Sequence, residues 1–256
     1  MHFETTVLQL KEFLILKGFC NVSEFQCEVN VENLMDWSEL GDLEDLKAWF
    51  VNQQQNCDLY VEDISLDQCR GWRYNDSLGR IEHNSGSFFY IQGVRVKKSS
   101  MREVEDGWDQ PIVTQVGFDG GVLGLLRSKR NGVPYYLVEA KAEPGNPDKV
   151  QICPTLQATY SNINQKHGGR QPKFVDLFLN SSSHSSSKIL FDQWMSEDGG
   201  RLHRKRNRGM LVEVPNMIDE LEIPSGFKWI SLFQIKKLLK LNSWVSPHIR
   251  GIISHL

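Results

Sequence analysis

The stretch from Tyr135 to Gly169, YYLVEAKAEPGNPDKVQICPTLQATYSNINQKHGG, constrains the fold of this chain most. Its alternating apolar and polar residues predict two β-strands, joined by a turn at Pro144-Gly145-Asn146. In the first strand the polar row is Glu139, Lys141 and Glu143. In the second, the pattern places Val150, Ile152, Pro154, Leu156 and Ala158 on one face, and Gln151, Thr155, Gln157, Thr159 and Ser161 on the other. We therefore expect a hairpin with one apolar and one polar face.

The polar face of this hairpin is a candidate ligand site. An ordinary antiparallel sheet also has one face in water, so alternation alone favours a simple solvent-exposed face. Solvated faces usually carry many Lys and Glu residues, however, whereas this one carries short donors and acceptors beside a row of two carboxylates and an ammonium group. Asn162, His167, Gly168 and Gly169 follow within a few residues. This concentration of reactive side chains favours a ligand site.

Length and composition indicate a soluble globular protein. With 256 residues, no internal repeat and no clear linker, the chain is expected to form one domain. Within it we expect an N-terminal helical part (1–63), a β-rich ligand-binding core (64–215) and C-terminal helices (216–256). The net charge of −3 gives no general attraction to nucleic acid or membranes. The five scattered cysteines argue against a disulfide framework and against a zinc site, and fit a reducing cytoplasm.

Periodicity and turn signals predict the other elements. Helices are expected over 5–18, over 43–55 with Asp42 as N-cap, after the Ser231/Gln234 capping box, and after Ser246-Pro247. Residues 19–37 give no clear pattern. Strands are expected over 81–97, 112–116, 122–127, 189–197 and 201–214, with turns at 119–121, 131–132 and 198–200. A short element is expected over 172–179, and the serine-rich segment 180–187 is expected to be a loop. The N-terminus lacks the features of a signal peptide, and no segment is long and apolar enough to span a membrane.

The basic run RLHRKRNRG has three interpretations. A nucleic-acid interface is disfavoured, since the protein as a whole is slightly acidic. A charged edge strand is an ordinary structural alternative. The third interpretation is a diphosphate site, because Arg204, Arg206 and Arg208 are spaced to project from one side of one strand, with Asn207 between the last two.

Two tryptophans and two histidines are further candidates. Trp72 and Trp108, the latter followed by Gln110, could be core aromatics, but turn and polar neighbours also allow stacking on a base or a sugar. His83 and His167 could be ordinary hydrogen-bonded histidines. If they converged with Lys141 and Glu143, the set would suffice for proton transfer. We find no phosphate-binding, serine-hydrolase, zinc-protease or dinucleotide-binding motif and no metal-ligand spacing.

These residues resemble the NDP-hexose 2,3-dehydratase family of deoxysugar biosynthesis. The resemblance rests on Gly71-Trp72 and on the segments HNSGSFFYIQG (83–93), REVEDGWDQPIVTQ (102–115), LVEAKAEPGNPDKVQICPTLQATYSNINQKHGG (137–169) and KRNRGMLVE (205–213). It implies an α+β, Nudix-like module with a mixed or antiparallel sheet flanked by helices. Family members carry two such modules in tandem, and this chain has one, which implies a homodimer. The glutamate-rich signature of Nudix hydrolases is absent, so metal-dependent diphosphate hydrolysis is not implied.

The resemblance implies a cofactor-independent hydro-lyase that removes water from C2 and C3 of an NDP-4-keto-6-deoxyhexose, most simply a dTDP sugar, in the cytoplasm. Glu143 or His83 would be the base at C3. Lys141, Asn162 or His167 would stabilise the enolate or protonate the leaving hydroxyl. The implied substrate-binding residues are Trp72, Trp108, Gln110, Gln157, Thr159, Ser161, Arg204, Arg206, Asn207 and Arg208. Two alternatives remain open, namely a non-catalytic NDP-sugar-binding module and a lyase or isomerase acting on another 4-keto sugar nucleotide.

Overall fold

The computed structural model describes residues 2–101, 104–118, 120–166, 168–180, 187–196 and 200–256 and has an α+β fold. The α+β class with a mixed sheet and flanking helices is thereby confirmed. The helices are α1 (Phe3–Leu16), α2 (Glu24–Glu32), α3 (Leu43–Gln55), α4 (Tyr160–Ile163), α5 (Val175–Leu179), α6 (Met217–Glu220), α7 (Leu232–Leu238) and α8 (Pro247–Ile253), with short 3-10 turns at Leu66–Gln68 and Val116–Phe118. The predicted turns at 119–121 and 198–200, the loop 180–187 and His167 lie wholly or partly outside the described residues.

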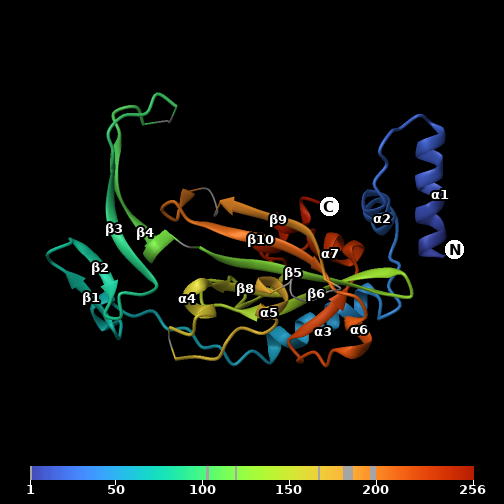
Figure 1. Cartoon of the computed structure of the whole chain (residues 1–256). Helices are drawn as coiled ribbons and strands as arrows, with labels where there is room; N and C mark the ends of the chain where they lie inside the picture. Colours follow the sequence, from blue (N-terminus) through green and yellow to red (C-terminus); the bar gives the residue numbers. More distant parts are fainter. Residues whose placement is uncertain (1, 102–103, 119, 167, 181–186, 197–199) are drawn as a thin grey trace.

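Eleven described strands form two sheets (Figure 1). The small sheet has the order β1-β2-β3-β4, and the large one the order β11-β6-β5-β10-β9, with β7 paired to β6 and β8 paired to β5. The strands are β1 (Trp72–Asn75), β2 (Arg80–His83), β3 (Phe89–Val96), β4 (Trp108–Gln115), β5 (Gly121–Arg130), β6 (Val133–Ala142), β7 (Val150–Pro154), β8 (Leu156–Thr159), β9 (Lys188–Ser196), β10 (Arg206–Glu213) and β11 (Phe227–Ile230).

The β5–β6 hairpin is the centre of the large sheet. Its turn residues Asn131 and Gly132 have φ values of 49° and 77°, the left-handed conformation that a two-residue hairpin turn requires and that the Asn-Gly pair predicts. Next to it, β10 runs parallel to β5, pairing Arg208 with Val122 and Glu213 with Arg127. The sheet is therefore mixed.

The second predicted strand of the hairpin is broken at Thr155. Residues 150–154 pair with β6, whereas residues 156–159 pair with β5. The Thr155 hydroxyl accepts a hydrogen bond from Leu126 N at 2.9 Å and donates one to Leu137 O, and so bridges β5 and β6 where they separate. Because the chain changes its partner strand at Thr155, the side chains after Thr155 point to the opposite face of the sheet from the one that simple alternation predicts.

The prediction that Val150, Ile152, Leu156 and Ala158 share one face is therefore wrong. Val150 and Ile152 belong to one apolar cluster, together with side chains of α3, α7 and α8. Leu156 and Ala158 belong to the other cluster, together with side chains of α1 and α5. Helices from the N-terminal part of the chain thus contribute to both cores, and the polar residues of the hairpin are distributed differently from a simple alternation.

The small sheet departs from the sequence prediction at one point. We expected a single strand over 81–97, but β2 ends at His83 and β3 begins at Phe89. A turn intervenes, in which Gly86 N bonds to His83 O at 3.0 Å, and Phe88 has a φ of 77°. The chain reverses here, so β2 pairs with β3 instead of continuing into it. Strands β3 and β4 form a long two-stranded arm that projects from the body (Figure 1).

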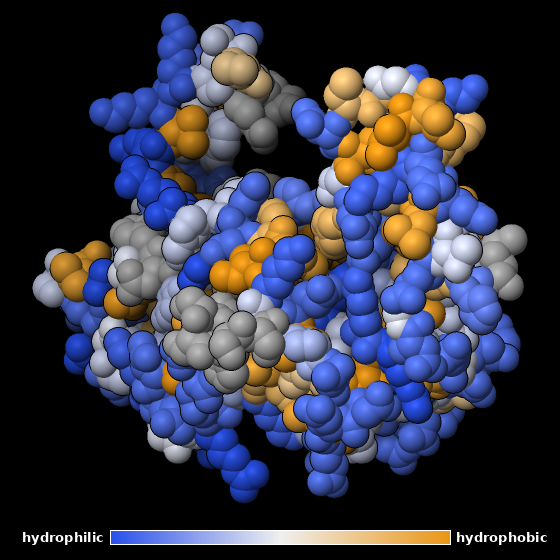
Figure 2. Space-filling view, turned by 45° about the vertical axis from the view of Figure 1, so that its right-hand side comes forward, coloured by the Kyte–Doolittle hydropathy of each residue, from blue (hydrophilic) through white to orange (hydrophobic). Residues whose placement is uncertain are grey.

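The predicted helix caps are confirmed. The Asp42 side chain accepts hydrogen bonds from Glu44 N and Asp45 N at the start of α3. Ser231 and Gln234 form the expected capping box of α7, and Ser246 caps α8. The predicted helix over residues 5–18 is α1. Its outer side and the segment that follows it expose apolar side chains, which make the projecting knob at the upper right of Figure 2 partly apolar: Leu8, Phe13, Ile15, Leu16 and Phe19.

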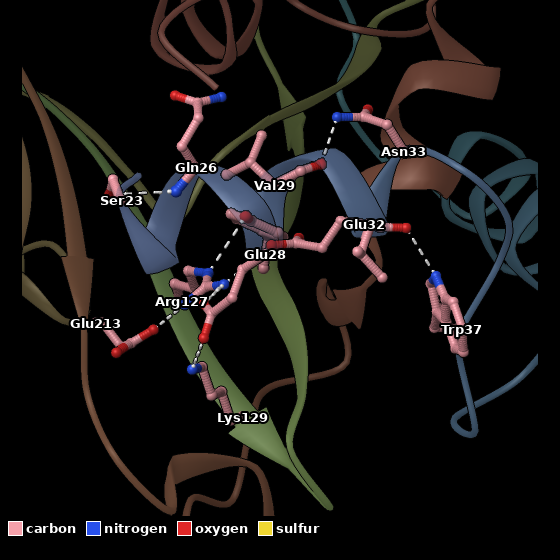
Figure 3. A network of polar contacts seen from close by, with 12 residues as sticks. Ser23, Gln26, Glu28, Val29, Glu32, Asn33, Trp37, Arg127, Lys129 and Glu213 are labelled. Atoms are coloured by element: carbon pink, nitrogen blue, oxygen red, sulfur yellow. Dashed lines mark hydrogen bonds and ion pairs between the residues drawn. The ribbon is translucent and has the colours of Figure 1, made fainter. Parts of the chain in front are cut away.

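A buried cluster of charges joins α2 to the large sheet (Figure 3). Arg127 of β5 is 1% exposed, and its guanidinium contacts Glu28 at 2.8 Å, Glu32 at 2.9 Å and the carboxylate of Glu213. Lys129 forms an ion pair with Glu28. Because these charges are removed from water, they stabilise the docking of α2 only as a matched set.

The pKa values of two carboxylates in this cluster are shifted in opposite directions. Burial raises the pKa of Glu32, since the loss of water outweighs the attraction of Arg127. For Glu28 burial also favours the neutral form, but the hydrogen bond from Lys129 and the charge of Arg127 outweigh it and lower the pKa. The two carboxylates that α2 contributes to the cluster therefore differ in how readily they bind a proton.

Candidate functional site

A cavity of about 200 Å³ opens on the large sheet beside the central hairpin. Strand β6, the bridge at Thr155 and strand β8 supply one part of its wall. The segment before α5 and the first residue of β11 supply the rest. The lining residues are Glu139, Lys141, Thr155, Leu156, Gln157, Gln171, Pro172, Lys173 and Phe227.

An ion pair occupies the inner wall. Lys141 Nζ lies 3.3 Å from Glu139 Oε2, and the two side chains are 26% and 24% exposed. The two residues are two positions apart on β6 and therefore project from the same face. A carboxylate and an ammonium group in one cavity can accept and donate a proton, which is the function that the sequence suggested for this row.

Glu143 is attached to the same wall through Gln157. The side-chain amide of Gln157 donates to Glu143 Oε1 at 3.0 Å. Its carbonyl oxygen is buried and has no hydrogen-bond partner among the described residues. Buried acceptors are almost always satisfied in folded proteins, so this oxygen is suited to accept a hydrogen bond from a ligand hydroxyl.

Thr159, Ser161 and Asn162 lie further along the chain. Thr159 Oγ1 is 2.8 Å from Ser161 Oγ and caps α4 by accepting from Asn162 N at 3.3 Å. Ser161 lines a separate small hollow of about 70 Å³ between α4 and the loop that precedes β3. These three side chains therefore organise the start of α4, and none of them lines the cavity at Lys141.

Trp72 and His83 come together in the small sheet. They are paired across β1 and β2, with ring centroids 5.6 Å apart. His83 also packs edge-on against Phe88 at 4.9 Å, and its Nδ1 is 2.7 Å from Ser85 Oγ. A Cβ atom on Gly71 would lie only 2.6 Å from His83 Nε2, which explains the glycine there. These contacts hold His83 in a group of its own, and none of the described contacts joins it to Lys141 or Glu143.

Trp108 and Gln110 lie on the projecting arm. Trp108 Nε1 donates to Gln110 Oε1 at 2.6 Å. Gln110 also borders a groove of about 470 Å³ beside the exposed ion pair of Arg95 and Asp109. The arm is thus a second polar surface, formed by residues of β3 and β4 and distinct from the cavity at Lys141.

The arginine row differs from the prediction. Arg204 has a φ of 53° and lies before β10, so only Arg206 and Arg208 alternate on that strand. Asp192 accepts two hydrogen bonds from Arg208, at 2.7 Å and 2.5 Å. These hydrogen bonds lower the pKa of Asp192. The guanidinium of Arg206 lies 4.7 Å from the centre of the Trp194 ring.

Asn207 is separated from both arginines by the alternation of the strand. It is 5% exposed and borders a mostly apolar cavity of about 420 Å³ near Leu123 and His248. The basic run therefore distributes its side chains over two faces and does not form one continuous cationic surface.

Four lining residues of the cavity were missed by the sequence analysis: Gln171, Pro172, Lys173 and Phe227. Phe227 pairs with Glu139 across β11 and β6, more than eighty positions apart in sequence. No local pattern could reveal this pairing. The only signal near Lys173 was the apolar segment after residue 172, which we expected to be a short element.

Cys153 is paired with Glu139 across β7 and β6. Burial raises the pKa of its thiol to about 12, so the group stays protonated at neutral pH and is a poor nucleophile. All five cysteines are free thiols. In the described ranges, no three His, Cys, Asp or Glu side chains are grouped so that they could hold a metal ion. No described helix combines the length and the apolar character needed to cross a membrane.

Comparison with known proteins gives one family. The model of the NDP-hexose 2,3-dehydratase family matches residues 43–256. Proteins from Amycolatopsis orientalis, Saccharopolyspora spinosa and Streptomyces violaceoruber, each described as a dTDP-4-dehydro-6-deoxy-α-D-glucopyranose 2,3-dehydratase, are 33% identical to this chain over 217, 207 and 211 residues. The alignments cover 83%, 81% and 82% of this chain but only 44%, 40% and 45% of those proteins. This chain thus spans less than half the length of each.

Solved structures show weaker likenesses. The C. elegans Ap4A hydrolase matches 52% of this chain and 91% of its own, at 12% identity and a TM-score of 0.30. The NUDIX domain of Shewanella oneidensis NrtR, solved with ADP ribose, matches 54% of this chain and 86% of its own, at 10% identity and a TM-score of 0.29. At these TM-scores we draw no argument from either structure.

Proposed function

This chain belongs to the NDP-hexose 2,3-dehydratase family, and we propose that it removes water from C2 and C3 of a dTDP-linked 4-keto-6-deoxyhexose. One observation carries the proposal. The cavity that holds the Glu139–Lys141 pair and Gln157 is built entirely from residues within the family match. Its carboxylate, ammonium and amide groups are those that such an elimination needs.

The reaction needs acid–base groups and no redox step. The C4 ketone acidifies the C3 proton, so a base removes it and the electrons pass to the C4 oxygen as an enolate. The enolate then expels the C2 hydroxyl, which leaves as water after accepting a proton. A C2=C3 double bond forms with the C3 hydroxyl in place, and this enol tautomerises to a 3,4-diketo sugar. Because the C4 ketone of the substrate receives the electrons, the reaction needs no external oxidant or reductant.

We assign the groups from their places in the cavity and from the hydrogen bonds that connect neighbouring residues to it. Lys141 donates to the enolate oxygen, since its ammonium lies on the inner wall. Glu143, oriented by Gln157, is the first choice for the base. Glu139 is the alternative, because it lines the cavity directly. His83 is a second alternative, and its contacts with Trp72 and Phe88 favour a role in packing or in holding the nucleotide base.

A homodimer would restore the size of the longer relatives. This chain spans 40–45% of their length, so two copies would supply a comparable mass. The apolar side chains exposed on α1 support such an assembly, because a contiguous exposed apolar surface is typical of protein contacts. Sedimentation equilibrium tests this directly. A mass of one chain at micromolar concentration would contradict the dimer.

The same difference in length favours one alternative function. A chain that spans less than half of each relative could retain nucleotide-sugar binding without the elimination. This alternative predicts tight dTDP binding and an unchanged 4-keto substrate. It differs from the dehydratase in a single measurable property, which is turnover.

Proton NMR of the protein with dTDP-4-keto-6-deoxyglucose in deuterated buffer tests the proposal. We expect loss of the C2 hydroxyl and the appearance of a 2-deoxy-3,4-diketo sugar or its breakdown products. Exchange of the C3 proton without elimination would show a working base and contradict the proposed elimination from this substrate. An unchanged spectrum together with tight dTDP binding would replace the dehydratase by the non-catalytic binder.

A further inference from the structure

The cavity at Lys141 is too small for a whole nucleotide sugar. Pockets that enclose drug-sized ligands measure about 300–1,000 Å³, whereas this one measures about 200 Å³. Under the proposed function, the sugar ring occupies the cavity next to Lys141. The diphosphate, which is joined to C1 of that ring, must then lie at the opening.

Lys173 lies at this opening. It lines the cavity together with Glu139 and Lys141, but it is exposed, whereas those two residues are about one-quarter exposed. Its ammonium lies 5.9 Å from the centre of the Phe227 ring. Phe227 is paired with Glu139 in the sheet. The ammonium is thereby held beside the strand that supplies the inner wall.

The backbone around Lys173 is fixed by its neighbour. Phe174 has a φ of 63°, a conformation that is uncommon for a residue with a side chain. Its ring packs edge-on against Phe227 with centroids 5.2 Å apart. Residues 173 and 174 therefore both contact Phe227, which holds the rim of the cavity in place.

The charge of Lys173 is not neutralised within the described part of the chain, where its ammonium forms no ion pair. The arginines that the sequence suggested for the diphosphate differ in this respect. Arg208 is paired with Asp192 through two hydrogen bonds, and Arg206 is stacked on Trp194. Neither arginine lines the cavity at Lys141.

We propose that Lys173 binds the diphosphate of the nucleotide sugar at the mouth of this cavity, with Gln171 beside it as a hydrogen-bond donor. This inference rests on the proposed function and assigns the anion-binding group of the same site. A lysine is suited to this role, because it offers a mobile point charge to the phosphate oxygens. The position of Lys173 also sets the orientation of the substrate, with the sugar inside the cavity and the nucleotide outside it.

Calorimetric titration with dTDP and with thymidine tests the assignment. We expect Lys173→Met to weaken dTDP binding at least about tenfold, because a charge-assisted hydrogen bond is lost. Thymidine, which has no phosphate, should bind equally to the variant and to the parent protein. Lys173→Arg should retain most of the dTDP affinity. In turnover assays, Lys173→Met should raise KM and change kcat little, which a merely structural residue would not do.

Lys228→Met is the matched control. Lys228 follows Phe227 on β11, and its ammonium lies 5.8 Å from the Trp49 ring, so it makes the same kind of contact on the opposite face of the strand. This variant should bind dTDP like the parent protein.

Three outcomes separate this inference from the proposed function. Equal dTDP affinity of Lys173→Met and the parent, with turnover intact, would overturn the inference alone. If Lys173→Met binds dTDP more weakly but the parent protein catalyses no elimination, the diphosphate site is supported and the proposed dehydratase function is contradicted. No dTDP binding by the parent protein would overturn the inference, whatever the turnover.

Discussion

The side-chain amide of Gln157 donates a 3.0 Å hydrogen bond to Oε1 of Glu143. This bond joins the residue that follows β6 to β8, the strand that begins after Thr155 and pairs with β5. It leaves the other oxygen of Glu143 available to a substrate, and it fixes the direction in which the carboxylate points. The contact therefore links the split of the sheet to the geometry of the site.

Replacing Glu143 by Gln should abolish turnover and preserve dTDP binding. The substitution keeps the shape of the side chain and removes its basicity, and a positioned acid–base group typically contributes about 10²–10⁴ in rate. Steady-state kinetics and calorimetry measure the two effects separately. Glu139→Gln is the paired variant. If Glu139→Gln is inactive while Glu143→Gln keeps its rate, the base is Glu139.

Replacing Lys141 by Met should lower kcat by about 10²–10³, because a pre-placed donor to a developing oxyanion contributes about this much. Calorimetry with dTDP should show unchanged affinity, since the inner wall contacts the sugar and not the nucleotide. Lys149→Met is a suitable control, because Lys149 lies in the exposed turn before β7. An equal loss of rate in both variants would contradict a specific role for Lys141.

Replacing Arg127 by Met should destabilise the fold by about 3–5 kcal/mol, the usual cost of leaving a buried charge without its partner. The variant removes the cation shared by Glu28, Glu32 and Glu213, and leaves Glu28 with Lys129 as its remaining ion-pair partner. Urea unfolding followed by circular dichroism gives the free energy of unfolding. Arg95→Met is the control, because its pair with Asp109 lies on the exposed arm and its removal should change stability little. Equal stability of the two variants would show that the buried cluster does not hold α2 to the sheet.

Replacing Glu32 by Gln should flatten the pH dependence of stability. Burial raises the folded-state pKa of Glu32 above its ordinary value of 4.5. The proton is thus bound more tightly in the folded protein, and this contribution to stability is present below pH 4.5 and is lost as pH rises through the folded pKa. Glutamine cannot lose a proton, so the stability advantage of the parent over the variant should shrink with rising pH. Urea unfolding at several pH values between 4 and 9 measures this trend.

Glu28→Gln is a control for which the expected change of stability with pH has the opposite sign. The folded-state pKa of Glu28 is lowered, so its contribution to stability is present above pH 4.5 and is lost as pH falls through the folded pKa. Parallel pH profiles for the parent protein and Glu32→Gln would contradict a raised pKa of Glu32 in the folded protein.

Local sequence patterns predicted the helix caps and turns better than they predicted which strands pair with one another. The Asn131-Gly132 turn, the Asp42 cap and the Ser231/Gln234 capping box depend on neighbouring residues, and all three are confirmed. The face reversal at Thr155 depends on a strand that leaves β6 for β5, and alternation within one strand cannot reveal such an exchange.

The same limit applies to the site. Lys141 and Gln157 were identified from the polar face of one hairpin, and both line the cavity. Phe227 and Lys173 reach it from segments that are distant in sequence. Arg204 was misplaced because period-two spacing was extended through a residue with left-handed backbone geometry. Glu28 and Glu32, the partners of Arg127 on α2, were missed since this helix is short and polar and shows no regular apolar stripe.

The Arg127 cluster has a practical consequence for anyone who shortens this protein. The family match begins at residue 43, but two of the three carboxylates that surround Arg127 belong to α2, upstream of that point. A fragment trimmed to residues 43–256 would keep the guanidinium in the sheet and lose Glu28 and Glu32. Its interior would then carry an excess of positive charge and a water-accessible gap where α2 had been. The boundary of sequence similarity is therefore not a safe place to cut the chain.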